Sequence, residues 1–187
     1  TRVILIPQGE FVTYGALTYA ALASGKFPDT AQLAFAMGLV AFVFDLFAGR
    51  RSLNIRRIAR SLGLNVVLPG AVLLATLAFA GRNNPVFVDV GLALAIVACI
   101  GLYLYRIVFQ PIAHASVLTL LIASVGAHLA LQGFALVFFG AEGLRGPAIS
   151  DASFSLGALV FTGQSLGVYL ITAALIVALW LFFGTTL

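Results

Sequence analysis

The feature that most constrains this chain is a succession of apolar stretches, each about 20 residues long and almost free of charge. A helix needs about 20 apolar residues to cross the hydrocarbon core of a bilayer. Six stretches fit that length, and they cover approximately 3–24, 30–48, 62–81, 86–105, 116–139 and 166–183. We therefore expect an all-α integral membrane protein, a polytopic helical bundle of about six transmembrane spans.

The composition of the chain supports the same class of protein. Hydrophobic residues make up 62% of the 187 residues and charged residues only 9%, whereas about 25% of the residues of a soluble domain are charged. So few charges cannot cover a surface that faces water, which nearly excludes soluble enzymes and nucleic-acid-binding proteins. The single cysteine, Cys99, cannot form a disulfide within the chain.

The basic residues indicate the orientation of the chain, because arginine and lysine in short loops stay on the cytoplasmic side. With residue 1 in the cytoplasm, the cytoplasmic side holds Arg2, Arg50, Arg51, Arg56, Arg57, Arg60 and Arg106, and the outer side holds Lys26, Arg82 and Arg145. The opposite orientation reverses this ratio. We therefore expect both ends of the chain in the cytoplasm. Residues 140–165 then form an extracytoplasmic loop, in which 154–161 predict two brief strands around a glycine turn.

Five of these arginines lie in one short connector, and they are Arg50, Arg51, Arg56, Arg57 and Arg60. The connector 50–60 predicts a short amphipathic helix on the cytoplasmic side. Its charges either set the topology of the chain or bind anionic lipid head groups or an acidic partner surface.

The first apolar stretch is interrupted by Pro7 and Gly9 and carries the carboxylate of Glu10. An ionisable group within a span costs roughly 2.5–3.5 kcal/mol on insertion scales. Broken helices in transporters expose polar groups to a cavity, so Gln8 and Glu10 are candidates for the lining of a translocation path. The alternative is that Glu10 is solvated near the cytoplasmic interface or pairs with an arginine.

The fifth stretch carries Ser124, His128 and Gln132 at successive spacings of four residues, which places them on one face of a helix. Such a polar stripe either lines a translocation path or forms hydrogen bonds to a neighbouring helix. The sequence leaves both interpretations open.

Signals for enzymatic chemistry are weak. The pattern of residues 163–167 matches the Gly-x-Ser-x-Gly nucleophile elbow around Ser165, but that architecture needs a histidine after the serine, and His114 and His128 both precede it. The single lysine, Lys26, is followed by Phe27, so no phosphate-binding loop is present. No cysteine and histidine cluster has the spacing of metal ligands. We expect no catalytic residue, cofactor or metal, and any ATP is handled by a partner.

Two segments carry a resemblance to a known family. The first segment is 5–16. Its residues Gly9, Glu10, Phe11, Gly15 and Ala16 match a motif shared by the members of one family, Asn-Phe-Ala-His-Gly-Glu-Phe followed by Gly-Ala, and Gln8 stands in place of the histidine of that motif. In 106–140, the letters RIVFQPI, LIASVG, LQ and FG occur in the order and spacing of a second set of motifs, with Gln110 in place of an arginine. The chain resembles the permease subunits of ABC importers for branched-chain amino acids.

The resemblance implies a function and a set of partners. The chain would form a translocation path for branched-chain or related amino acids in the bacterial cytoplasmic membrane. Its partners would be a second permease subunit, two ATPase subunits and an extracytoplasmic solute-binding protein, with no nucleic acid. Residues 1–187 would be a single permease domain that lacks the family's first helix and its C-terminal part with the cytoplasmic coupling loop. The alternative is a membrane enzyme, a hydrolase using Ser165, or a structural membrane scaffold.

Overall fold

The computed structural model describes residues 5–48, 55–82, 84–140, 153–156 and 159–186. Contacts divide the chain into two compact units, Thr1–Gly146 and Pro147–Leu187. The expectation that 1–187 is one permease domain lacking a first helix and a coupling loop stays a prediction.

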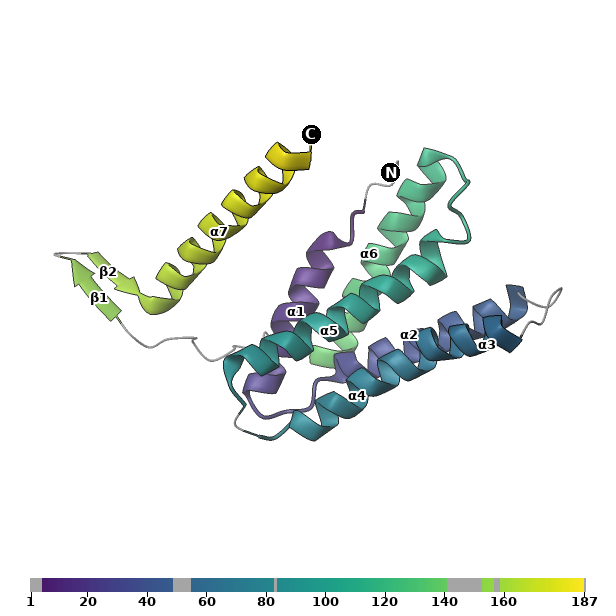
Figure 1. The fold of residues 1–187 in the computed structure, drawn as a ribbon, viewed down its shortest axis with the longest axis horizontal. Coiled ribbons are helices and arrows are strands. Elements are labelled where there is room, and N and C mark those ends of the chain that lie inside the picture. Colours follow the sequence, from purple (N-terminus) through teal and green to yellow (C-terminus); the bar gives the residue numbers. More distant parts are fainter. Residues whose placement is uncertain (1–4, 49–54, 83, 141–152, 157–158, 187) are drawn as a thin grey trace. The chain divides into compact units, whose positions relative to one another are not determined.

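The first unit consists of helices joined by short connectors (Figure 1). Its elements are α1 (Gln8–Ala23), α2 (Asp29–Ala48), α3 (Ile55–Leu62), η1 (Gly63–Val67), α4 (Leu68–Phe79), α5 (Val86–Leu104), η2 (Tyr105–Phe109) and α6 (Val117–Phe139). The segments η1 and η2 are π-helical. Because α3, η1 and α4 follow one another without a break, they form one rod, and α5 continues into η2 in the same way.

The predicted spans agree with these helices and with α7 (Gly163–Thr186) of the second unit. Within the described residues, five helices are long and apolar enough to cross a membrane, and they cover Asp29–Phe47, Ala59–Phe79, Val86–Phe109, Val117–Phe139 and Ser165–Gly184. The remaining predicted span, 3–24, contains α1. Its 16 residues measure about 24 Å, less than the roughly 30 Å of a bilayer core. The polytopic helical bundle is confirmed, and its first helix is shorter than the sequence suggested.

Successive rods of the first unit run in alternating directions. The connector between α1 and α2 lies close to the connector between α4 and α5. A Cβ added to Gly25 in the first would lie 4.0 Å from the Cα of Gly81 in the second. We call this the Gly25 end of the unit, residues 22–30, 79–82 and 84–89. At the opposite end, which we call the Asn65 end, the last turns of α2 meet η1 and η2. The helices α1 and α6 run parallel, since later residues of α1 contact later residues of α6.

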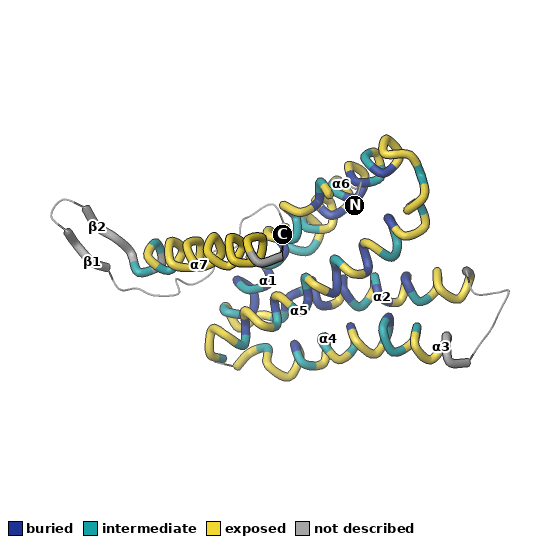
Figure 2. Tube along the Cα trace, turned by 45° about the horizontal axis from the view of Figure 1, so that its top comes forward, coloured by how far each residue is buried: buried dark blue, intermediate teal, exposed yellow. Residues whose placement is uncertain are grey.

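The core of this unit lies where α1 and α2 face α5. Tyr14, Ile96 and Ile100 are fully buried there, and Ala34 and Ala41 of α2 belong to the same cluster. Small side chains allow helix backbones to approach closely, which is how helices pack in membranes. Figure 2 shows the buried positions on the sides of the rods that face one another.

The outward faces of the helices carry large apolar side chains. Val12, Phe87 and Trp180 are 74%, 89% and 73% exposed. So much exposed apolar surface is unfavourable in water and favourable in a lipid bilayer. Together with the lengths of the helices, it identifies the chain as a multi-pass membrane protein.

Both π-helical segments have the same local cause. The N–H of Leu68 donates to Gly63 O, five residues earlier, and the N–H of Gln110 donates to Tyr105 O. A proline follows each segment, Pro69 after η1 and Pro111 after η2. Because proline has no N–H and its ring crowds the preceding turn, a regular α-helical hydrogen-bond ladder cannot continue through these positions. Just before its proline, each rod therefore contains a π-helical turn, whose hydrogen bond spans five residues instead of four.

The second unit contains a hairpin and one long helix. The strands β1 (Ser153–Leu156) and β2 (Leu159–Thr162) pair antiparallel, with Phe154 opposite Phe161. This confirms the two brief strands predicted around Gly157. The helix α7 (Gly163–Thr186) begins directly after β2. The side of the membrane on which the hairpin lies stays a prediction.

Candidate functional site: the seam between α1 and α6

The helix α1 begins inside the bundle. Pro7 precedes its first residue, and the N–H of Ile6 donates a hydrogen bond to Ser124 Oγ at 2.9 Å. Ser124 is fully buried and lies two turns into α6, about 10 Å from the start of that helix. The proline predicted to break the first span therefore marks the start of α1, and Ser124 satisfies the backbone just before it.

Glu10 and His128 meet one turn further along the two helices. His128 Nδ1 lies 3.2 Å from Glu10 Oε1, and the side chains are 34% and 14% exposed. The nitrogen has no hydrogen-bond partner of good geometry among the described residues, so the contact is an ion pair in distance rather than an aligned hydrogen bond. The pair is neutral when the imidazole is protonated and carries one negative charge when it is not.

Tyr14, one turn after Glu10, makes the next contact between α1 and α6. Its hydroxyl donates to Leu131 O at 2.8 Å, and the side chain is fully buried. Thr18, one turn later, donates to Tyr14 O and shares a hydrogen bond of 2.8 Å with Thr30 of α2. We call the contacts of Ile6, Glu10 and Tyr14 with α6 the α1–α6 seam.

The predicted polar stripe of α6 turns around the helix along its length. Ser124 is buried, His128 is half-buried and Gln132 is exposed. Successive steps of four residues on a helix of 3.6 residues per turn drift by about 40° each. The stripe therefore starts in the seam and ends on an outward face. Gln8, at the start of α1, is also exposed.

The predicted cytoplasmic arginines are only partly described. Arg50 and Arg51 lie outside the described residues, and Arg56 and Arg57 lie on α3, whose backbone alone is described there. Arg60 is exposed near the end of α3. The prediction of a short helix in this connector is confirmed for Ile55–Leu62, and the helix runs on into the next span instead of ending.

A second polar cluster, which the sequence analysis missed, lies at the Asn65 end. Asn65 is fully buried, and its Nδ2 donates to Asp45 Oδ2 at 2.8 Å and to Ser61 Oγ at 3.1 Å. Ser61 also donates to Asp45, and Arg106 donates to Asn65 Oδ1. Asn65 of η1 thus bridges the carboxylate of Asp45 in α2 and the guanidinium of Arg106 in η2. We call these four residues the Asn65 network.

The backbone next to Asn65 also has its hydrogen-bond partner. The π-helical turn leaves Leu64 O without its usual donor, and the hydroxyl of Tyr103 donates to it at 2.8 Å. Asn65 O faces Gly38, where an added Cβ would lie 2.4 Å from that oxygen. Glycine at position 38 is therefore required for α2 to pass over η1. An asparagine four residues before a proline in an apolar stretch is the sequence signal that could have located this cluster.

Other chemistry finds little support in the described parts of the chain. Ser165 follows a two-stranded antiparallel hairpin, whereas the nucleophile elbow belongs to the sheet of an α/β-hydrolase. No group of three or more His, Cys, Asp or Glu residues there could hold a metal ion. No protein-family model, curated protein or solved structure matches this chain.

Proposed function

We propose that this chain is a permease subunit of an ABC importer and forms part of a translocation path for branched-chain or related amino acids. The observation that carries the proposal is the α1–α6 seam. It joins the two segments that resemble the family, 5–16 and 106–140, through contacts between residues 118 positions apart. Segments so distant in sequence are brought side by side by the packing of α1 against α6.

The chemistry of the seam supports a path rather than packing alone. An ionisable pair within membrane spans is costly and usually marks a functional position. The exposed Gln8 and Gln132 extend polar groups from this pair to the outward faces of α1 and α6. An exposed amide in hydrocarbon loses its hydrogen bonds, so these positions favour contact with a water-filled path or with a second permease subunit.

The partners follow from the same proposal. A second permease subunit would complete the path, two ATPase subunits would supply energy, and an extracytoplasmic solute-binding protein would deliver the amino acid. The proposed setting is the bacterial cytoplasmic membrane, with both ends of the chain in the cytoplasm. In that orientation the Asn65 end is cytoplasmic and the Gly25 end is outside.

Solute uptake into vesicles that hold the chain with its partner subunits tests this function. Glu10→Gln and Gln132→Leu should each lower uptake at least about tenfold, equivalent to 1.4 kcal/mol on the barrier, without lowering the amount of assembled complex. Gln32→Leu is the matched control, because Gln32 is an exposed glutamine at the start of α2. Unchanged uptake in both the Glu10 and the Gln132 variant would contradict the proposed path. Solute-independent hydrolase activity of the purified chain, lost in Ser165→Ala, would favour the enzyme instead.

Cysteine labelling tests the orientation. Lys26→Cys and His114→Cys, each in a Cys99→Ala background, place single thiols in exposed connectors at opposite ends of the unit. An impermeant maleimide should label position 26 from outside intact cells and position 114 only from inside. Labelling of both from one side would contradict the alternating topology, and exchanged sides would reverse the orientation.

A further inference from the structure

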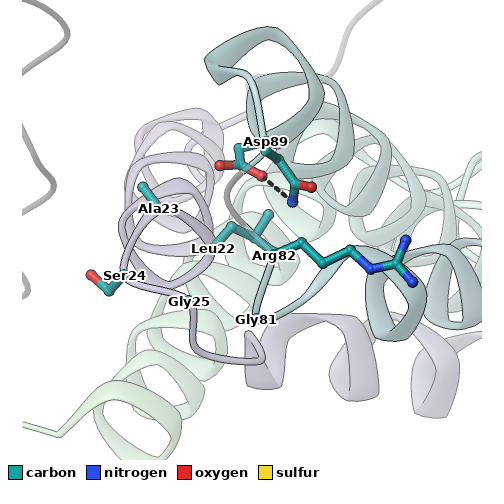
Figure 3. Close-up of a pocket in the computed structure, with 8 residues that line it drawn as sticks. Leu22, Ala23, Ser24, Gly25, Gly81, Arg82 and Asp89 are labelled. Atoms are coloured by element: carbon teal, nitrogen blue, oxygen red, sulfur yellow. Dashed lines mark hydrogen bonds between the residues drawn. The ribbon is translucent and has the colours of Figure 1, made fainter.

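A polar cavity of about 310 Å³ lies at the Gly25 end, far along α1 from the seam. Its wall is made by the last residues of α1, by the two glycine turns that carry Gly25 and Gly81, and by Asp89 in the first turn of α5 (Figure 3). The volume equals roughly ten water molecules. It is therefore large enough for a small organic ion.

Two turns with left-handed glycines form part of the cavity wall. Gly25 and Gly81 have φ angles of 70° and 79°, in the left-handed region that residues with a side chain rarely adopt. A Cβ added to either glycine would lie 4.0 Å from the backbone of the other. A side chain at either position would strain its turn.

Asp89 is the charged group of the wall. It is 5% exposed, and among the described residues its carboxylate receives one side-chain hydrogen bond, from Asn84 Nδ2 at 3.2 Å. Asn84 also donates to Phe79 O at 2.8 Å, which fixes its amide. No described cationic side chain forms an ion pair with Asp89. A carboxylate can accept about four hydrogen bonds, so most of its capacity is left for the contents of the cavity.

The charges around the cavity favour a cation. The last turn of α1 ends at its wall, and the C-terminal end of a helix carries partial negative charge. Arg82 is the one cationic side chain of the described lining, and Figure 3 shows its guanidinium directed away from Asp89. The dipole of α5 stabilises a carboxylate in its first turn, which accounts for the charge of Asp89 but not for its burial in the wall of a polar cavity.

We propose that this cavity binds a small monovalent cation, an organic ammonium or an alkali metal ion, with the Asp89 carboxylate as its anchor. An ammonium group would donate to the carboxylate oxygens, and an alkali ion would accept the same oxygens as ligands. The site lies at the opposite end of α1 from the Glu10–His128 pair and does not depend on the proposed transport role.

Equilibrium dialysis of the purified full chain with radiolabelled methylammonium or sodium tests the proposal, with no other organic ammonium or alkali ion added to the buffer. We expect saturable binding of one ion per chain. Asp89→Asn, which keeps the shape of the side chain, should weaken binding at least about tenfold, equivalent to 1.4 kcal/mol. Asp29→Asn is the matched control, because Asp29 lies in the first turn of α2 at the same end and does not line the cavity.

The outcomes separate the sources of the cation. Binding of methylammonium but not sodium assigns an organic ammonium, and the reverse assigns an alkali ion. No saturable binding of either ion to the unmodified chain overturns the proposal, as does equal binding to the Asp89→Asn variant. If that variant fails to fold, Ala23→Leu decides, because it fills the cavity and leaves every charge in place. Binding that survives Ala23→Leu also overturns the proposal.

Discussion

The Asn65 network and the α1–α6 seam both place ionisable residues in apolar helices. They differ in how completely the hydrogen bonds of these residues are satisfied. In the network, Asn65 is fully buried and bonded to both Asp45 and Arg106. In the seam, Glu10 and His128 touch, half-buried, without an aligned hydrogen bond. A satisfied polar cluster fixes one arrangement of helices, whereas an incompletely satisfied pair keeps capacity for another partner. The comparison favours an architectural role for the network and supports the function proposed above for the seam.

The largest effect on this comparison should come from Gly38→Ala. Its Cβ would lie 2.4 Å from Asn65 O and 2.8 Å from Pro69 Cγ, so α2 would have to move away from η1. We expect a loss of at least about 3 kcal/mol, the upper end of the range for overpacking. Equilibrium unfolding in mixed detergent micelles, followed by circular dichroism, measures the change. Gly126→Ala is the control, since nothing lies within 4 Å of its added Cβ.

Asn65→Leu should rank second. It removes the bridge between Asp45 and Arg106 and leaves both charged groups short of a partner. Hydrogen bonds to charged groups contribute about 1.5–3 kcal/mol each, but the two bonds belong to one network and do not add fully. We therefore expect a loss of about 2–3 kcal/mol in the same unfolding measurement. Ser61→Ala keeps the bridge and should cost only about 1 kcal/mol. Equal losses in the two variants would show that Asn65 is not the centre of the network.

Tyr14→Phe should have a smaller effect, although its hydroxyl is fully buried. It removes one hydrogen bond between α1 and α6, and such bonds between membrane helices contribute about 0.6 kcal/mol on average. The unfolding free energy should fall by about that amount. Tyr105→Phe, at an exposed position in η2, serves as the control and should leave the unfolding free energy unchanged. A loss near that of Asn65→Leu would make the seam architectural as well.

Glu10→Gln should have the smallest effect on stability. The amide keeps the shape of the side chain, and the contact with His128 has no aligned hydrogen bond to lose. We expect the unfolding free energy to stay within about 0.5 kcal/mol, the usual range for changes away from structural contacts. The same variant should impair uptake. A large stability loss without a defect in uptake would make the Glu10–His128 pair architectural and contradict its proposed function.

The sequence predicted what depends on local composition and missed what depends on tertiary contacts. Five spans and the hairpin followed from apolar length and from the turn at Gly157. The break at Pro7 also followed, because proline acts on its own helix. The pairing of Glu10 with His128 could not be predicted, since it requires α1 and α6 to run parallel. The role of Asn65 depends on Gly38, which approaches it from a different helix.

The parallel packing of α1 against α6 also sets an order of events during synthesis. Chains are made from the N-terminus at about 5–20 residues per second, so the 118 residues between Glu10 and His128 take roughly 6–24 s to appear. During that interval α1 and α2 can already insert, while the carboxylate of Glu10 has no imidazole to meet. The seam is therefore among the last contacts of the first unit to close, and a nascent chain stalled before α6 would hold an unpaired acid in its first helix.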